Sequence, residues 1–219
     1  MQLIDVSHSV ESGMLTYKGL PAPVICDYLS REASRRVYSP GTQFRIGRID
    51  MVANTGTYVD SPFHRYADGK DLAALPLSSL AHLPCLVAHL PSAVGRAIDR
   101  LPFSTDEVRG KAVLVHTDWA RHWRSEQYFE GFPHLTAALA EWLRAAGALL
   151  VGIDSHNIDC TDNGDRPVHS TLLQAEIPIV EHLCGLEALP ERGSNFYAVP
   201  VKVRGLGTFP VRAFAAIED

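Results

Sequence analysis

Apolar and polar residues alternate along much of the chain, and this alternation predicts β-strands. The clearest alternating run covers residues 44–52, where the pattern repeats every second residue. Apolar runs typical of buried strands cover residues 85–90, 112–117 and 149–153. Weaker strand patterns cover residues 3–10, 177–180, 196–203 and 209–215. Pro178 favours a sheet edge or a strand start, and residues 205–207 would join the last two strands into an antiparallel pair.

Helical periodicity is rarer. One helix has apolar residues at helical spacing and Gly147 as its C-cap; those residues are Leu135, Leu139, Trp142, Leu143 and Ala146. A Ser104-x-x-Glu107 capping box starts a short helix, and another short helix is expected over residues 170–174. Residues 112–153 form the one strong strand–helix–strand unit. We therefore predict an α/β fold with a mixed, largely antiparallel sheet or barrel and helices packed outside it, not a doubly wound sheet.

Length and composition favour one domain over residues 1–219. The hydrophobic content of 46% is enough for a substantial core, and the net charge of -5 is spread without a basic run. Nucleic acid is therefore not an expected partner. No apolar segment approaches the roughly 18 residues of a membrane span, and the first residues lack a signal-peptide pattern, so we expect a cytoplasmic protein. Its four cysteines, which form no Cys-x-x-Cys pair, are expected to be reduced core thiols: Cys26, Cys85, Cys160 and Cys184.

A dense polar stretch follows the alternating run and covers residues 54–64. If the strand continues, Asn54, Tyr58 and Asp60 project from one face, because side chains two apart share a face. Gly56 would leave an open slot between them. Such a row of polar groups on stiff backbone suits a catalytic or metal site.

The end of this stretch turns back on itself. Pro62 would end the strand and bring His64 back near the polar row. The alternative is an edge strand with a solvated polar face, which the spacing alone leaves equally open.

A second polar cluster contains His169 and Glu181, with Asp154 and Asp159 before them. A His and a Glu separated by a short helix and a strand can converge on a metal ion. Taken alone, however, such a pair more often consists of surface residues.

The two clusters together carry a family resemblance. The chain contains Gly-Thr-x-x-Asp-x-Pro-x-His at residues 56–64 and His-x11-Glu at residues 169–181. This order resembles the cyclase family, which includes bacterial kynurenine formamidases and isatin hydrolases and whose signature is His-x-Gly-Thr-His-x-Asp-x-Pro-x-His. Other matching pieces occur in order: Asp5-Val6-Ser7-His8, Tyr17, Thr117-Asp118-Trp119, Gly152-Ile153-Asp154, Ile177-Pro178-Ile179-Val180-Glu181 and Phe209-Pro210-Val211-Arg212-Ala213. The resemblance implies a swivelling β/β/α-like fold.

The resemblance also implies metal ions, but the sequence departs from the signature at two positions. Asn54 and Tyr58 replace the first two signature histidines, which hold one divalent metal together with the Asp in formamidase-type members. The ligand set of a second metal survives as Asp60, His169 and Glu181. Because an amide oxygen and a neutral phenol are poor Zn²⁺ ligands, we expect one metal per chain, Zn²⁺ or Mn²⁺, with a position left for water.

The resemblance assigns His64 to proton transfer, and His64 is also a candidate further ligand. The metal would activate a water molecule and polarise the scissile carbonyl, while His64 moves the proton to the leaving group. Tyr58 would donate to the tetrahedral oxyanion, and Asn54 would orient Tyr58 or the substrate. Three aromatic residues are candidates for a substrate pocket, although each is equally compatible with an ordinary core or interface position: Tyr17, Phe63 and Trp119.

The remaining predictions concern five other histidines and a long segment near the start of the chain. Five histidines match no ligand position and are expected to be structural or surface residues: His116, His122, His134, His156 and His182. Residues 11–42, rich in Gly, Pro and Ser, are expected to form a long surface excursion. Since the resemblance implies a homodimer or tetramer, this segment is a candidate exchange surface between subunits.

The predicted function is hydrolysis of a small N-acyl or cyclic amide or ester by a metal-dependent enzyme acting on carbon–nitrogen bonds. The family's best-known substrate is N-formyl-L-kynurenine, an intermediate of tryptophan catabolism. One alternative is a catalytically degenerate member that binds a small metabolite, which the loss of two histidines favours. Another is a lactone or imide hydrolase in which Tyr58 does new acid–base work. The survival of Asp60, His64, His169 and Glu181 favours an enzyme.

Overall fold

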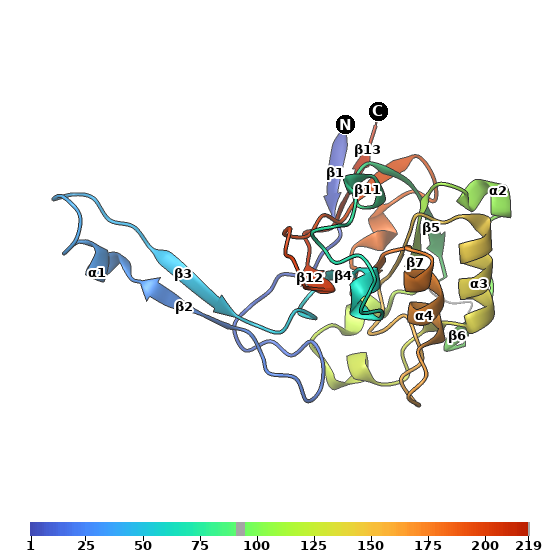
Figure 1. Ribbon diagram of the computed structural model, residues 1–219, viewed down its shortest axis with the longest axis horizontal. Helices are drawn as coiled ribbons and strands as arrows, with labels where there is room; N and C mark the ends of the chain where they lie inside the picture. Colours follow the sequence, from blue (N-terminus) through green and yellow to red (C-terminus); the bar gives the residue numbers. More distant parts are fainter. Residues whose placement is uncertain (91–94, 219) are drawn as a thin grey trace.

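A nine-stranded mixed sheet forms the centre of the computed structural model, which describes residues 1–90 and 95–218 (Figure 1). In sheet order its strands are β1 (Gln2–Asp5), β13 (Phe214–Ile217), β11 (Ser194–Tyr197), β5 (Leu83–His89), β7 (Ala112–His116), β9 (Leu150–Ile153), β10 (Ile179–Glu181), β4 (Tyr58–Asp60) and β12 (Thr208–Pro210). Strands β5, β7, β9 and β10 run parallel, and the strands outside them pair antiparallel. The predicted α/β fold with a mixed, largely antiparallel sheet is confirmed.

Both faces of the central strands are buried, which explains their continuous apolar sequences. Val113 and Val115 of β7 belong to one core cluster, whereas Leu114 belongs to the cluster on the opposite face. The first cluster also includes Leu143 and Leu172, which α3 (Ala137–Ala146) and α4 (Pro167–Gln174) contribute. The two longest helices therefore cover one face of the sheet (Figure 1).

The remaining elements are short. They are the helices α1 (Arg31–Ser34) and α2 (Thr105–Val108), the strand pairs β2 (Val24–Leu29) with β3 (Ile46–Asp50) and β6 (Ala97–Ile98) with β8 (His134–Leu135), and the 3-10 helices η1 (Pro62–His64), η2 (Leu77–Ser79), η3 (Trp119–His122), η4 (Glu126–Phe129) and η5 (Leu186–Ala188). Within the described residues, no helix has the length and apolar character needed to cross a membrane.

The local end signals of the predicted helices are present. Thr136 caps α3 by accepting a hydrogen bond from the Leu139 N–H, and Gly147 ends the helix in the left-handed conformation, with φ of 81°. Ser104 and Glu107 form the predicted capping box of α2. These ends depend only on nearby residues, so the sequence predicts them well.

Two predicted strand relations are wrong. The alternating run does not continue into the polar stretch, because β3 pairs with β2 in a separate hairpin and β4 starts only at Tyr58. The last strands do not pair as a hairpin either: β11 pairs with β13, whereas β12 pairs with β4. Of the two alternatives for Pro178, the strand start is correct and the sheet edge is not: Pro178 directly precedes β10, which is an interior strand between β9 and β4.

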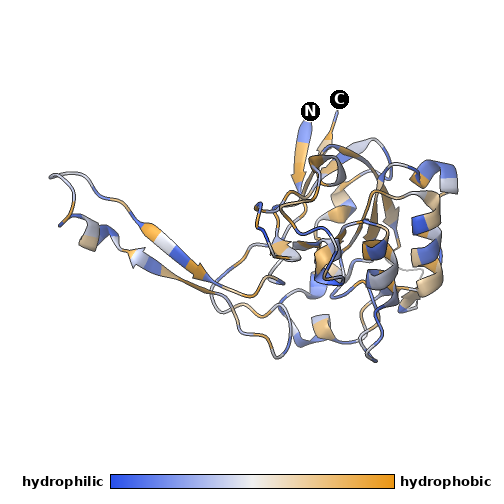
Figure 2. Ribbon diagram, in the orientation of Figure 1, coloured by the Kyte–Doolittle hydropathy of each residue, from blue (hydrophilic) through white to orange (hydrophobic). Residues whose placement is uncertain are grey.

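Strands β2 and β3 and helix α1 form an arm, residues 24–50, that extends away from the rest of the chain (Figure 1). The arm includes residues 24–42 of the surface excursion predicted over residues 11–42, and this part contains a strand and a short helix where no regular element was expected. Apolar segments occur on both of its strands (Figure 2), and its exposed residues include Tyr28 and Val37, which are 76% and 72% exposed. Cys26 lies on the arm and is exposed, so the prediction of core thiols is wrong for this residue; of the four free cysteines only Cys85 is buried.

Candidate metal centre and its cavity

A cavity of about 800 Å³ opens beside β4, β10 and the start of α4. Six of the nine predicted site residues line it: Tyr17, Asn54, Tyr58, His64, His169 and Glu181. Asp60 lies at its base, where an Asp60 carboxylate oxygen, a His64 ring nitrogen and a His169 ring nitrogen all lie within 4.8 Å of one another. Phe63 and Trp119 do not line the cavity; the Trp119 indole N–H donates to the Tyr128 carbonyl at 3.0 Å. The structure thus brings together seven of the nine residues.

Cross-strand pairing places the inner residues. On β4, Tyr58 and Asp60 are two residues apart and share a face, as predicted. Tyr58 lies directly opposite Glu181 of β10, and Asp60 lies opposite Thr208 of β12. Side chains opposite each other in neighbouring strands are in contact range. Three adjacent strands therefore present one polar row.

Before β4, the chain does not supply the open slot predicted at Gly56. Gly56 has φ of 66°, and a Cβ there would lie 2.9 Å from Val10 Cγ2. The glycine therefore serves a left-handed turn in a tight space. Asn54 lies in a bend and not on a continued strand, yet it still lines the cavity.

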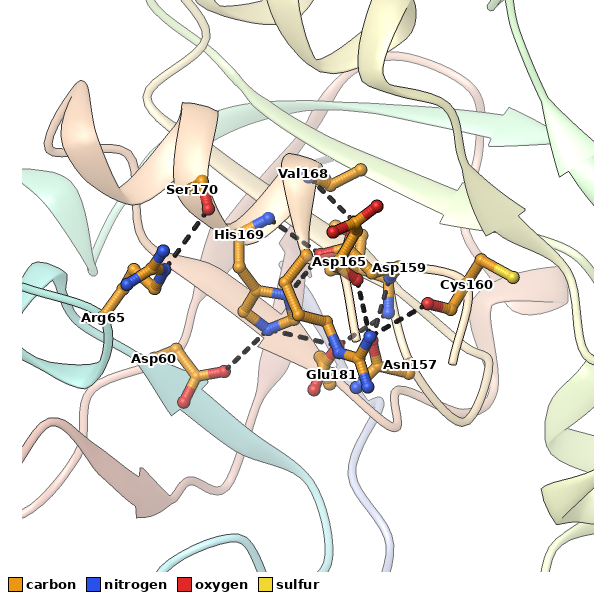
Figure 3. Close-up of polar contacts among 12 residues, drawn as sticks. Asp60, Arg65, Asn157, Asp159, Cys160, Asp165, Val168, His169, Ser170 and Glu181 are labelled. Carbon is orange, nitrogen blue, oxygen red and sulfur yellow. Dashed lines mark hydrogen bonds and ion pairs between the residues drawn. The ribbon is translucent and has the colours of Figure 1, made fainter. Parts of the chain in front are cut away.

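His169 lies among three acidic side chains (Figure 3). Its Nε2 is 3.6 Å from Asp60 Oδ2 and 3.7 Å from Glu181 Oε1. Its Nδ1 is 2.7 Å from Asp159 Oδ2, and the same carboxylate accepts the backbone N–H of His169 at 2.9 Å. Asp159 therefore sets the orientation of the ring and leaves Nε2 facing the two carboxylates.

These residues fit a divalent metal ion. Two ligands about 2.1 Å from a tetrahedral ion lie about 3.4 Å apart, close to both distances from His169 Nε2. Asp60 is fully buried, and its Oδ2 accepts no hydrogen bond from the residues that the structure describes. A buried carboxylate oxygen without a donor is costly unless a cation satisfies it. The Asp159–His169 contact is also the usual outer support of a metal-bound imidazole.

Charges around His169 agree with this interpretation. Burial alone lowers its pKa, but the Glu181 charge and the contacts with Asp159 and Asp60 outweigh burial and raise the pKa to about 10. Burial raises the pKa of Glu181, and the nearby Asp60 charge adds to that effect, while His169 opposes it. The pocket thus favours a positive charge at the position of His169 Nε2.

His64 lies at the exposed side of the centre, and its tautomer follows from counting protons. Thr208 Oγ1 has one proton and donates it to Asp60 Oδ1, which as a carboxylate oxygen can only accept. The 2.8 Å contact between Thr208 Oγ1 and His64 Nδ1 then requires His64 Nδ1 to be the donor. In the neutral ring the other nitrogen, Nε2, then carries no proton and can act as a base.

Tyr58 donates its hydroxyl proton to Glu181 Oε2 at 2.5 Å. Tyr17 lies 2.8 Å from the Tyr58 hydroxyl and accepts a hydrogen bond from the Asn157 side-chain amide at 3.0 Å. Burial, followed by the charge of Glu181, raises the pKa of both tyrosines well above 10, so both are neutral phenols. A neutral Tyr58 is not the phenolate that would replace a histidine ligand.

Comparison with known proteins identifies the fold and the family. The family described as "Putative cyclase" matches residues 4–160. The chain belongs to this family. The kynurenine formamidase of Bacillus cereus is 26% identical over 211 residues, which cover 96% of this chain and 95% of that protein. The kynurenine formamidase of Geobacillus thermodenitrificans is 31% identical over 170 residues, covering 77% of this chain and 78% of that protein.

Solved structures agree. A structure described as a potential metal-dependent hydrolase with cyclase activity has a TM-score of 0.79 and 26% identity, and the alignment covers 100% of this chain and 98% of that one. Isatin hydrolase A from Labrenzia aggregata has a TM-score of 0.82 at 18% identity, covers 100% of this chain and 94% of that one, and supports the fold alone. The family predicted from the sequence is confirmed.

Four residues of this cyclase-family site were missed by sequence reasoning or given no role in it. The sequence gives Asp159 no specific role, and neither Thr208 nor Asn157 has a motif of its own. His156 was expected to be structural or on the surface, but it is buried, lines the cavity and packs against Tyr17 with ring centroids 4.5 Å apart. Of the other four histidines in that group, His116, His134 and His182 are buried and His122 is partly buried.

A close backbone approach offers the one signal that could have revealed Thr208. A Cβ on the neighbouring Gly207 would fall on the backbone of His64, so only glycine lets β12 approach η1 this closely. From its sequence, the Gly205-Leu206-Gly207 stretch is expected only to connect two strands. Glycines at such a spacing also indicate a place where two backbones meet.

Proposed function

We propose that this protein is a metal-dependent hydrolase that cleaves a small N-acyl or cyclic amide or ester, as kynurenine formamidases do. The observation that carries the proposal is the pairing of a buried cation site with a free base. Asp60 Oδ2 and Glu181 Oε1 face His169 Nε2 at 3.6 Å and 3.7 Å, and the unprotonated His64 Nε2 lies beside them at the cavity. The names of the relatives agree with this class of reaction.

Asp60 and His169 would hold a divalent cation, which would supply Lewis acidity and would lower the pKa of a water molecule bound to it. His64 removes the proton of the attacking water through Nε2 and returns it to the leaving nitrogen or oxygen. Thr208 keeps the base competent, because its hydroxyl holds the other ring proton on Nδ1. Asp159 performs the equivalent task for His169 by accepting the Nδ1 proton.

The hydrogen bond from Tyr58 to Glu181 affects how Glu181 can bind a cation. Glu181 Oε2 is occupied by the Tyr58 proton, and Glu181 Oε1 accepts the Ile158 backbone N–H at 2.7 Å. We propose that Tyr58 orients Glu181 in this way and keeps it from binding a second cation. Its predicted role as donor to the oxyanion stays a prediction, because the structure directs its one proton to Glu181.

We propose one Zn²⁺ or Mn²⁺ per chain, held by Asp60, His169 and one further residue. Sequence comparison favoured Glu181 as the third ligand, whereas the group of close ligand atoms contains His64 instead. The variants Glu181→Gln and His64→Gln separate the two. Metal content measured by elemental analysis should fall well below one per chain in whichever variant has lost a true ligand.

The first experiment combines metal content and turnover. Protein purified without chelator is expected to hold about one metal per chain and to hydrolyse at least one of N-formyl-L-kynurenine, isatin or a small lactone. A chelator should abolish turnover, and added Zn²⁺ or Mn²⁺ should restore it. Protein that binds neither metal at micromolar concentration and turns over none of these would instead be the small-metabolite binder.

We further propose that two copies associate through the arm. A two-stranded hairpin alone in water is marginal, so its exposed apolar residues call for a covering surface. We propose that a second copy of the chain covers the arm, because their charges are of opposite sign. The arm contains five arginines and three acidic residues, whereas the whole chain has a net charge of -5. Light scattering should give a dimer or larger assembly, and Tyr28→Asp together with Val37→Asp should give a monomer.

A further inference from the structure

We propose that Arg65 and Arg166 form a carboxylate-recognition subsite at the cavity, so that the substrate is an N-acyl or cyclic amide carrying a free carboxylate. This inference rests on the proposed hydrolase function and adds the charge of its substrate. Both arginines line the cavity that contains the candidate metal centre. Among the residues that the structure describes, no carboxylate pairs with either guanidinium.

Arg65 is anchored by one side of its head group only. Its Nε donates to Ser170 Oγ at 3.3 Å (Figure 3), and the guanidinium carbon lies 5.3 Å from the centre of the Tyr66 ring. In the described part of the chain, the two terminal nitrogens donate no hydrogen bond to the protein. A guanidinium held in this way presents two parallel N–H donors to an incoming carboxylate.

Arg166 is held more firmly. Its Nη1 donates to the carbonyls of Cys160, Asn163 and Asp165 at 3.2, 2.9 and 2.6 Å. These bonds fix the head group on the loop before α4 while Nε and Nη2 make none with the described residues. Preorganisation of this kind lowers the entropy lost on binding a ligand.

The two head groups flank the turn of helix that carries His169. The Ser170 backbone N–H donates to the Arg166 carbonyl at 3.0 Å, which makes them neighbours one helical turn apart. Residues at this spacing have Cβ atoms about 5–6 Å apart. Arg65, tied to Ser170, and Arg166 are therefore both attached to the first turns of α4, the helix that carries His169, and both line the cavity.

The balance of charge explains why a carboxylate needs such a subsite. Glu181 and Asp165 line the cavity, and Asp60 lies behind its two histidines, so an anionic substrate meets acidic groups as it enters. A bound divalent cation offsets the inner carboxylates, and the two guanidiniums then give the rim a net attraction for an anion. A neutral substrate would make no use of this arrangement.

The test compares an acid with its ester. Metal-loaded protein is given N-formyl-L-kynurenine and the methyl ester of the same compound. Wild type should prefer the acid at least about tenfold in kcat/KM, with most of the difference in KM. Arg65→Gln and Arg166→Gln should each lower this preference several-fold, and the double variant should bring it close to one. The control Arg144→Gln removes an arginine that pairs with Glu141 outside the cavity and should keep the preference.

The outcomes distinguish the two proposals. Equal hydrolysis of acid and ester by wild type, or an unchanged preference in the double variant, would overturn the subsite while the hydrolase function stands. If wild type hydrolyses neither compound, the hydrolase function fails for this substrate, and calorimetry with L-kynurenine and its methyl ester then tests the subsite by binding alone. Tighter binding of the acid that disappears in the double variant supports the subsite; equal binding of both compounds overturns it.

Discussion

The cavity has an inner wall and a rim that are built in different ways. On the inner wall, Asp60 and Glu181 are 0% and 1% exposed, and the supporting hydrogen bonds come from Thr208, Tyr58 and Ile158. On the rim, the His64 side chain is 36% exposed, and the guanidinium of Arg65 has a single hydrogen bond to the residues that the structure describes. The inner wall therefore buries and fixes the carboxylates of the candidate metal centre, whereas the rim presents the proposed base and the guanidinium groups to a substrate.

The largest effect is expected when the inner wall loses a charge. Asp60→Asn removes the carboxylate that faces both His64 and His169, so metal content should fall well below one per chain and kcat/KM should drop at least about 10³-fold, or about 4 kcal/mol. Asp68→Asn makes the same change at an exposed position and should leave both unchanged. Full metal content in Asp60→Asn would show that the cation is held elsewhere.

A smaller effect is expected at the boundary between wall and rim. His64→Gln removes the proposed base but retains Asp60 and His169, so kcat should fall at least about 10²-fold. Steady-state kinetics should be accompanied by elemental analysis of the same preparation. Unchanged metal content identifies His64 as the base, whereas a loss of metal identifies it as a ligand; kcat within a few-fold of wild type would remove it from the chemistry.

The support of His64 can be tested without touching the ring. Thr208→Val removes the hydroxyl that keeps the His64 proton on Nδ1, and we expect kcat to fall about tenfold with an altered pH–rate profile. Thr208→Ser retains the hydroxyl and should behave like wild type. If Thr208→Val and Thr208→Ser have the same pH–rate profile, Thr208 does not determine which nitrogen of His64 carries the proton.

The smallest effect concerns stability. Burial, followed by the charges of Arg124 and Lys18, lowers the pKa of His8 and His156 respectively from 6.5 to about 4. Because each folded-state pKa lies below the unfolded value, the stability from neutral imidazole is present above pH 6.5 and is lost as the pH falls toward 4, by up to about 1.4 kcal/mol per pH unit for each histidine.

Asp154 acts in the opposite direction, since burial raises its pKa to about 7 and its contribution grows as the pH falls from 7 toward 4. The buried His182, whose pKa is also lowered well below 6.5, adds to the two histidines. With the metal bound at Asp60 and His169, we expect these three histidines to outweigh Asp154, so the free energy of unfolding in urea should be lower at pH 5 than at pH 7. His156→Gln should reduce this difference, whereas His82→Gln at an exposed position should not. An unchanged difference in His156→Gln would show that burial of this ring does not govern the pH dependence.

Local patterns in the sequence determined much of this protein. Strands β5, β7 and β9 follow from continuous apolar runs, and helix α3 follows from its spacing and its caps. The short spacing from Tyr58 to His64 placed a phenol, a carboxylate and an imidazole together, because a strand alternates its side chains and Pro62 begins a turn. The family signature then connected this stretch to His169 and Glu181, which no periodicity could have joined to it.

Tertiary structure alone decided how these groups are held. Thr208 contacts Asp60 and His64 because β12 lies beside β4, and Tyr58 reaches Glu181 because β10 lies on the other side. The separation of the arm from β4 is likewise a matter of which strands pair. Pairing between strands far apart in the chain depends on packing of the whole sheet, and a strand's own periodicity shows which face is buried but not which neighbour it meets.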